Sequence, residues 1–255
     1  MNLKIAYFYQ EELNLYGDTG NVEILKYRAE ARGFDVAVVN ITSMTSVTSN
    51  FLKDINIVFM GGGPDSGQKD MYQDLLENKG PHLKDYIENA GVALFICGSY
   101  QLLGNYYQSA DGSHLQGLEI FDLYTQHFGH DKPRCVGNTV CKLSETILKD
   151  SVFKSVNTVG DTIVGFENHG GRTYLGNNAQ PFANVLRGFG NNGEDKTEGV
   201  HHKNAIGTYF HGPILSKNPH IADYLIAKSL KLDNLIEIDN SLIASTHSAL
   251  LKRFK

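Results

Sequence analysis

The chain has 255 residues, of which 41% are hydrophobic and 20% charged, a composition typical of a globular protein with a sizeable core. Its formal net charge is −5 and it has no long run of Lys or Arg, so a nucleic-acid partner is disfavoured. No stretch approaches the ~20 apolar residues that span a bilayer. The N-terminus lacks a signal-peptide layout, and three scattered cysteines argue against a disulfide framework. We therefore expect a cytoplasmic protein without a membrane anchor.

In the N-terminal part of the chain, short apolar runs alternate with segments of helical spacing. This alternation predicts a mostly parallel sheet flanked by helices. In chain order the pattern predicts strands over residues 4–9, 35–39, 55–60 and 92–96, and helices over residues 22–32, 68–77, 82–89 and from 99 towards 106.

The middle of the chain, roughly residues 117–185, has a pattern more typical of β structure. The best strand candidates are residues 134–143, 162–167 and 182–186. A further strand is predicted over 205–210, and helices over 219–230 and 241–252. Because no Pro-, Ser- or Gly-rich linker divides the chain, we predict a single α/β domain over residues 1–255 with a β-rich elaboration.

Cys97 stands where a buried strand ends and Gly98 begins a turn into a helix. Ligands of open α/β sheets bind outside the carboxyl ends of the strands, and a tight strand-to-helix turn exposes a nucleophile there. The partial positive charge of a helix N-terminus also favours a thiolate. The alternative is that Cys97 is one more small buried apolar residue, which is the usual state of a free cysteine.

His211 also follows an apolar strand and precedes Gly212 and Pro213. Two strand ends of one sheet can bring Cys97 and His211 to the same edge, and a thiol needs such a basic partner to react at neutral pH. Most of the ten histidines are expected to be ordinary surface or core residues.

A glycine run, Gly61-Gly62-Gly63-Pro64-Asp65, follows the third predicted strand. Its backbone N–H groups can approach a ligand closely and stabilise an oxyanion. A tight turn is the alternative, whereas a phosphate loop is disfavoured because GxxxxGK[ST] does not occur. A second glycine motif, GxGxxG over residues 188–193, is followed by Glu194-Asp195-Lys196 without helical periodicity, so we interpret it as a polar loop.

Together, the glycine run, Cys97-Gly98-Ser99-Tyr100-Gln101 and the strand-terminal histidine resemble the class I glutamine amidotransferases. The resemblance implies a flavodoxin-like α/β fold, Cys97 as nucleophile and His211 as base. It also implies oxyanion donors at Gly62 or Gly63 and at Gly98, and a substrate contact at Gln101. Many members carry a Glu two residues after the histidine. Here the residues are His211-Gly212-Pro213, as in the subgroup that includes cobyric acid synthase, so the acid is absent, supplied elsewhere in the chain, or donated by a partner.

Two further segments resemble the GatD family, the glutaminase subunits of lipid II isoglutaminyl synthase. They are residues 14–21, Asn-Leu-Tyr-Gly-Asp-Thr-Gly-Asn, and residues 207–215, which contain His-Gly-Pro. The resemblance implies that L-glutamine is hydrolysed and that ammonia passes to a Mur-ligase-like partner, MurT. That partner amidates D-glutamate of the peptidoglycan stem with ATP and Mg²⁺, so no cofactor and no metal is expected on this chain.

The same resemblance assigns Arg134 to the substrate, although a plain surface cation would also fit. Asn168 and His169 lie in a polar cluster at a predicted strand end, where they could line the glutamine pocket or simply cap a turn. Cys135 and Cys141 are six residues apart on a strand and need no chemical role. Three alternatives remain open: an amidotransferase subunit for a corrin carboxylate, a stand-alone thiol hydrolase, and a non-catalytic binding module.

Overall fold

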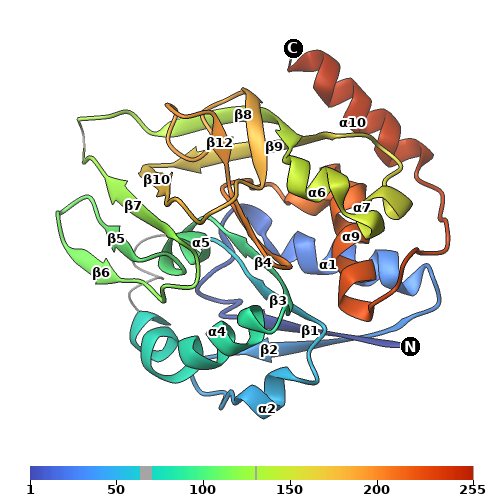
Figure 1. The fold of residues 1–255 in the computed structure, drawn as a ribbon, viewed down its shortest axis with the longest axis horizontal. Coiled ribbons are helices and arrows are strands. Elements are labelled where there is room, and N and C mark those ends of the chain that lie inside the picture. The colour runs from blue at the N-terminus through green and yellow to red at the C-terminus, as the bar shows by residue number, and fades with distance from the viewer. Residues whose placement is uncertain (64–70, 130, 255) are drawn as a thin grey trace.

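The computed structural model describes residues 1–63, 71–129 and 131–254 (Figure 1). Pro64 and Asp65 of the glycine run lie outside the described residues, as does the beginning of the helix predicted over 68–77.

A six-stranded sheet forms the centre of the molecule, with the order β13-β14-β4-β3-β1-β2. All neighbouring strands are parallel except β13, which pairs antiparallel with β14. The prediction of a mostly parallel sheet is therefore confirmed. Its strands are β1 (Asn2–Phe8), β2 (Asp35–Ile41), β3 (Ile57–Met60), β4 (Val92–Ile96), β13 (Val200–His202) and β14 (Ala205–Thr208).

Burial of the strands follows their place in the sheet. Every residue of β3 and β4 is buried, because helices cover both faces of the central strands. The outermost strand, β2, instead exposes much of its length. This explains why β3 and β4 appear in the sequence as continuous apolar runs.

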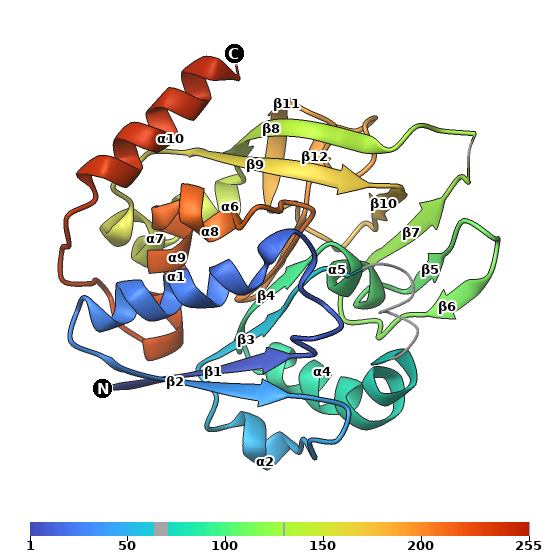
Figure 2. The ribbon, with the colours of Figure 1, turned by 180° about the vertical axis from the view of Figure 1, so that it is seen from behind.

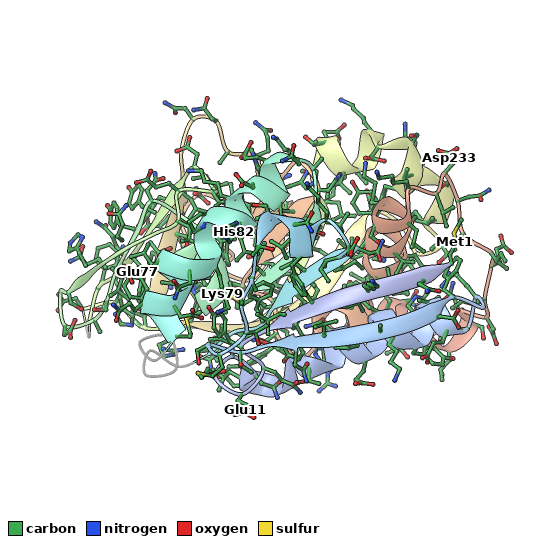
Figure 3. The ribbon with its side chains drawn as sticks, turned by 90° about the horizontal axis from the view of Figure 1, so that it is seen from below. Met1, Glu11, Glu77, Lys79, His82 and Asp233 are labelled. Carbon is green, nitrogen blue, oxygen red and sulfur yellow. The ribbon has the colours of Figure 1, made fainter. Side chains whose placement is uncertain are left out.

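Helices cover both faces of the central sheet (Figures 2 and 3). On one face lie α1 (Thr19–Glu30), α8 (Ile214–Lys217) and α9 (Pro219–Leu230), and on the other lie α2 (Ser49–Leu52) and α4 (Gly80–Glu88). Figure 3 shows Glu77, Lys79 and His82 on the helical segment that covers the face of the sheet opposite to α1. That segment runs unbroken from residue 71 to 88 through a π-helical turn, Leu75–Lys79, so the predicted division into two helices was wrong.

The β-rich elaboration forms two more four-stranded sheets, β10-β7-β5-β6 and β12-β11-β8-β9. Their strands are β5 (Tyr106–Gln108), β6 (His114–Gln116), β7 (Leu123–His127), β8 (Cys135–Leu143), β9 (Thr162–His169), β10 (Gly171–Leu175), β11 (Ala183–Arg187) and β12 (Thr197–Glu198). The helix predicted from 99 towards 106 is only α5 (Gly98–Leu102), since Tyr106 already begins β5. Two short helices, α6 (Glu145–Lys149) and α7 (Ser151–Val156), were not predicted.

The C-terminal helix α10 (Ser241–Arg253) extends along the outside of the sheet β12-β11-β8-β9 (Figure 1). No helix of the described residues is long and apolar enough to cross a membrane.

A buried ion-pair cluster joins α1 to α9. Arg28 donates to both carboxylate oxygens of Asp223 at 2.7 and 2.6 Å, and Arg32 donates to the same carboxylate at 2.9 Å. All three side chains are almost fully buried. A carboxylate shared by two arginines in this way offsets the cost of burying their charges. The cluster thereby fixes α1, which follows the loop after β1, against α9, which follows β14 and α8.

Replacing Asp223 by Ala should destabilise the fold by about 3–5 kcal/mol, because it leaves two buried guanidinium groups without their shared carboxylate. Urea unfolding monitored by circular dichroism measures the change. The control is Asp161→Ala, whose ion pair with Lys142 is half exposed and should matter little. Equal stability of the two variants would contradict this account.

Candidate active site

Four neighbouring strands of the main sheet end side by side. Phe8 of β1 is paired with Met60 of β3, Met60 with Phe95 of β4, and Ile96 with Thr208 of β14. Because these strands are parallel, the residues that follow them gather at one edge. They are Asp18 in the loop after β1, Gly61–Gly63 after β3, Cys97 after β4, and His211 after β14.

Cys97 occupies a strained turn between β4 and α5. Its φ of 51° and ψ of −106° are rarely adopted by a residue with a side chain, and its side chain is largely buried. The Ser99 hydroxyl accepts the N–H of Ile96 at 2.9 Å and lies 2.8 Å from the Met60 carbonyl oxygen. Ser99 therefore holds the turn against the neighbouring strand β3, a role that the sequence analysis did not assign.

His211 lies fully buried beside this turn. Its backbone N–H donates to Phe166 O at 2.7 Å, which ties the end of β14 to β9. Burial by itself would lower the pKa of His211, but the charge of the Cys97 sulfur and the hydrogen bond to Asp18 outweigh it and raise that pKa to about 10. The imidazole is therefore protonated at neutral pH, as suits a thiolate–imidazolium pair.

Gly62 stands at the point where these segments meet. A Cβ atom there would lie 2.8 Å from His211 Cε1 and 3.1 Å from Cys97 Cβ, so any side chain at this position would push these groups apart. Its N–H donates to Asp18 Oδ2 at 2.7 Å and is thus already engaged, which bears on its predicted role as an oxyanion donor. Gly98 begins α5, so its N–H has no acceptor within the helix and suits that role better. Gly63 is the next residue of the same segment and the last one described before residue 71.

Gln101 and His169 both contact the side chain of Tyr209. The Gln101 side-chain amide donates to the Tyr209 hydroxyl at 3.0 Å. The His169 ring stacks on Tyr209 at 3.6 Å, and its Nδ1 donates to Gly171 O at 2.7 Å. Burial lowers the pKa of His169, so the ring is neutral at pH 7. Gln101 lies in α5, directly after Cys97, and His169 lies against Tyr209. Their contacts with substrate stay predictions.

Arg134 and Asn168 form an accessible rim next to His211. Arg134 donates to the side-chain and backbone oxygens of Asn168 at 3.0 and 2.9 Å. Asn168 in turn donates to the Tyr16 hydroxyl at 2.6 Å. The Tyr16 ring packs edge-on against the His211 ring, with 4.8 Å between the ring centroids. The two predicted substrate residues are therefore joined to each other and, through Tyr16, to His211.

The GxGxxG segment is a loop, as predicted, and Glu167 holds it in place. The Glu167 carboxylate accepts the N–H groups of Phe189 and Gly190 at 2.7 and 2.8 Å. Gly188, Gly190 and Gly193 all have positive φ, which explains the glycine spacing as a turn requirement.

Asp18 and Glu198 are two buried carboxylates that the sequence analysis gave no role. Asp18 belongs to the 14–21 segment, and an aspartate before a helix usually indicates only a cap. Glu198 accepts the Thr208 hydroxyl at 2.5 Å and the Tyr209 N–H at 3.0 Å, just ahead of His211. Burial raises the pKa of Glu198 to about 8. Nothing in its polar loop sequence distinguishes it from the exposed acids nearby.

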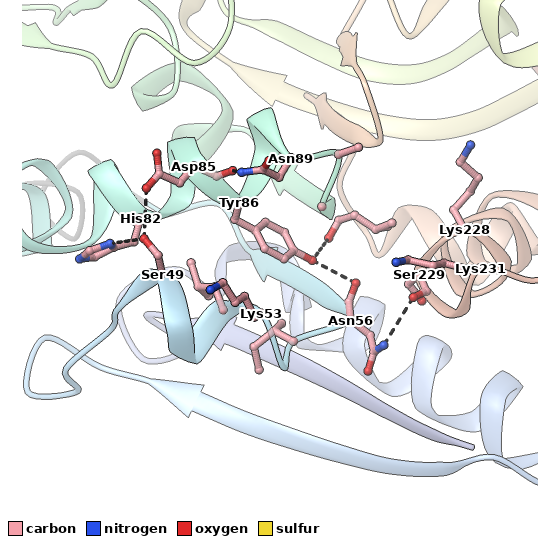
Figure 4. A pocket seen from close by; sticks show the side chains of 15 residues that line it. Ser49, Lys53, Asn56, His82, Asp85, Tyr86, Asn89, Lys228, Ser229 and Lys231 are labelled. Carbon is pink, nitrogen blue, oxygen red and sulfur yellow. Dashed lines mark hydrogen bonds between the residues drawn. The ribbon is translucent and has the colours of Figure 1, made fainter.

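A separate cavity of about 550 Å³ opens at the opposite end of the sheet. In Figure 4, Ser49 from α2 points toward His82 and Asp85 of α4, and the Tyr86 hydroxyl points toward Asn56. None of its lining residues belongs to the group around Cys97. Among the described residues, no group of three or more His, Cys, Asp or Glu side chains is placed to hold a metal ion.

This fold and this arrangement of cysteine, histidine and glycine loop define a class I glutamine amidotransferase. Comparison with known families agrees: the CobB/CobQ-like glutamine amidotransferase domain matches residues 4–219, and the chain belongs to that family. Among solved structures, the glutaminase domain of Trypanosoma brucei CTPS with bound acivicin superposes with a TM-score of 0.57. It covers 92% of this chain and 98% of that one at 11% identity, which shows a shared fold.

Two curated relatives are closer in sequence. The lipid II isoglutaminyl synthase subunit GatD of Staphylococcus aureus is 40% identical over 98% of this chain and 96% of its own length. The GatD subunit of Streptococcus pneumoniae is 39% identical over 90% of this chain and 81% of its own. Both are described as glutamine-hydrolysing.

Replacing Gly62 by Ala should lower kcat by on the order of 10²-fold, because the new methyl group displaces His211 from Cys97. The backbone at Gly62 does not have a positive φ, so the fold itself should tolerate Ala. Steady-state glutamine hydrolysis and thermal unfolding are measured together. Gly137→Ala is the control, since a Cβ there meets nothing within 4 Å, and a loss of activity confined to Gly62→Ala is expected.

Replacing Glu198 by Gln should change how stability depends on pH. Because burial raises the Glu198 pKa to about 8, the folded protein binds a proton that the unfolded chain releases near pH 4.5. The free energy of unfolding of the wild type therefore decreases as the pH rises from about 4.5 to about 8. The Gln variant has no such decrease, because its side chain does not titrate. Urea unfolding at pH 5, 7 and 8.5 compares the two, and parallel pH profiles would refute the raised pKa.

Proposed function

We propose that this chain is the glutaminase subunit of a lipid II isoglutaminyl synthase, hydrolysing L-glutamine to L-glutamate and ammonia. The observation that carries the proposal is the strained Cys97 turn, packed through Gly62 against the fully buried His211. Membership of the amidotransferase family and the two GatD relatives support the choice of glutamine as substrate.

In the proposed reaction, the Cys97 thiolate attacks the side-chain amide carbon of glutamine. The oxyanion that forms is held by backbone N–H groups, with Gly98 the best placed donor. As the carbon–nitrogen bond breaks, His211 gives its proton to the departing ammonia and a thioester remains. His211 then takes a proton from water as the water oxygen attacks the thioester carbon. The carbon–sulfur bond breaks, the Cys97 thiolate is regenerated, and the new carboxylic acid loses its proton to leave as glutamate.

Arg134 supplies a cation that can pair with the α-carboxylate of the substrate. Arg134 is exposed and already aligned by Asn168, so the pair can hold the α-carboxylate of glutamine. Gln101, fixed by Tyr209, lies one turn after Cys97 and would contact the substrate from inside.

The ammonia is proposed to pass to a MurT-type, Mur-ligase-like partner in the cytoplasm. That partner would bind ATP and Mg²⁺ and amidate D-glutamate to D-isoglutamine in lipid II. The partner is required because ammonia released into bulk water is protonated and no longer nucleophilic. All three cysteines of this chain are free thiols, which suits a reducing compartment.

The test is glutamate release from L-glutamine by the wild type and by Cys97→Ala, each alone and with the co-purified synthetase chain. Cys97→Ala should lose at least about 10³-fold in kcat, because no other group can form the thioester. Cys141→Ala, which removes a buried thiol from β8, is the matched control and should stay active. A fully active Cys97→Ala protein would refute the assignment, and equal turnover without any partner would favour a stand-alone thiol hydrolase.

A further inference from the structure

Asp18 directly precedes helix α1, a position where an aspartate normally caps the helix by accepting its first N–H groups. Here the Asp18 side chain makes no capping hydrogen bond. The N–H of Thr19 instead donates to Asn14 Oδ1 at 2.9 Å. Helix formation therefore does not account for this carboxylate.

The carboxylate turns into the catalytic centre instead. Its Oδ2 accepts the Gly62 N–H at 2.7 Å, and its Oδ1 lies 3.4 Å from Nδ1 of His211. Asp18 itself is fully buried. The second contact is longer than a typical hydrogen bond, as catalytic contacts often are before substrate binds.

Charge compensation links Asp18 to His211. A buried carboxylate is costly unless a cation or several donors face it. The imidazolium of His211 is the cation that faces Asp18, and the hydrogen bond between them raises the pKa of His211. The other ring nitrogen, Nε2, has no hydrogen-bond partner among the described residues. That nitrogen is the one left for proton exchange with substrate and water.

We propose that Asp18 is the positioning residue of the catalytic set, taking the place of the acid that the His211-Gly212-Pro213 segment lacks. It keeps a proton on Nδ1 and aims Nε2 at the reacting atoms, while its second oxygen fixes the Gly62 loop in the same arrangement. The proton on Nδ1 stays there, hydrogen-bonded to Asp18, throughout the reaction. Only Nε2 exchanges a proton: it gives one to the departing ammonia and later takes one from water. The inference rests on the proposed function for its catalytic meaning.

The test is Asp18→Asn, which keeps the shape of the side chain and removes its charge. An amide group facing Nδ1 favours the wrong tautomer, so kcat for glutamine hydrolysis should fall on the order of 10²–10⁴-fold with little change in KM. ¹⁵N-histidine NMR titration is the second readout. The pKa of His211 should move down towards its ordinary value, because Asp18 is one of the two groups that raise it. Both readouts are taken on the chain alone and in complex with its synthetase partner.

Glu167→Gln is the matched control, since Glu167 is equally buried but holds the loop at Gly190 and does not contact His211. It should leave the His211 titration unchanged. If Asp18→Asn does not fold, Asp18→Ser, a smaller polar side chain without the charge, replaces it in both measurements.

Wild-type kcat in the Asp18 variant, alone or in the complex, would overturn the inference, as would an unchanged His211 titration. If the wild type itself releases no glutamate, the proposed function fails, and the titration alone then decides whether Asp18 controls the state of His211.

Discussion

The site depends on the absence of a single side chain at Gly62. Three segments meet there so closely that a Cβ atom would lie within 3.3 Å of Asp18, His211 and Cys97 together. Such an approach is possible because β1, β3, β4 and β14 are neighbours whose carboxyl ends are in register. A shift of one strand by a single residue would separate the groups by about 3.3 Å. The register of the sheet, set by its buried apolar strands, is therefore also what sets the catalytic distances.

Buried polar groups hold the segments that carry Cys97 and His211. Ser99 ties the Cys97 turn to β3, and Glu198 holds the end of β14 ahead of His211. Glu167 acts in the same way on a separate loop, at Gly190. Each of these carboxylates and hydroxyls accepts backbone N–H groups, which reduces the cost of burying it. The strained φ of Cys97 persists because these contacts over-determine the surrounding backbone.

Sequence patterns predicted five of the six strands of the central sheet, the Cys97 turn and the position of His211 after a strand, because buried parallel strands and their glycine-marked ends have strong local signals. The antiparallel edge strand β13, which has only three residues, was not predicted. They did not predict α6 and α7, or the short extent of α5, because helices of five or six residues have too few turns to show periodicity. Nor could they give Asp18, Ser99 or Glu198 a role. The importance of these residues comes from partners far away in the chain, and no local pattern distinguishes such an Asp, Ser or Glu from a cap or a surface residue.

Residues 14–21 and 207–215, which carry the resemblance to GatD, lie far apart in the sequence and touch in the fold. A side chain at Gly20 would strike Pro213, and the Asn21 side chain accepts the Leu215 N–H at 3.0 Å. Asp18 reaches His211 across 193 residues of sequence. The backbone N–H of Cys97 also donates to Thr208 O, at the end of β14. Cys97, Asp18 and His211 can therefore come together only when β14 has joined the sheet beside β4, which makes their arrangement a property of the completed fold.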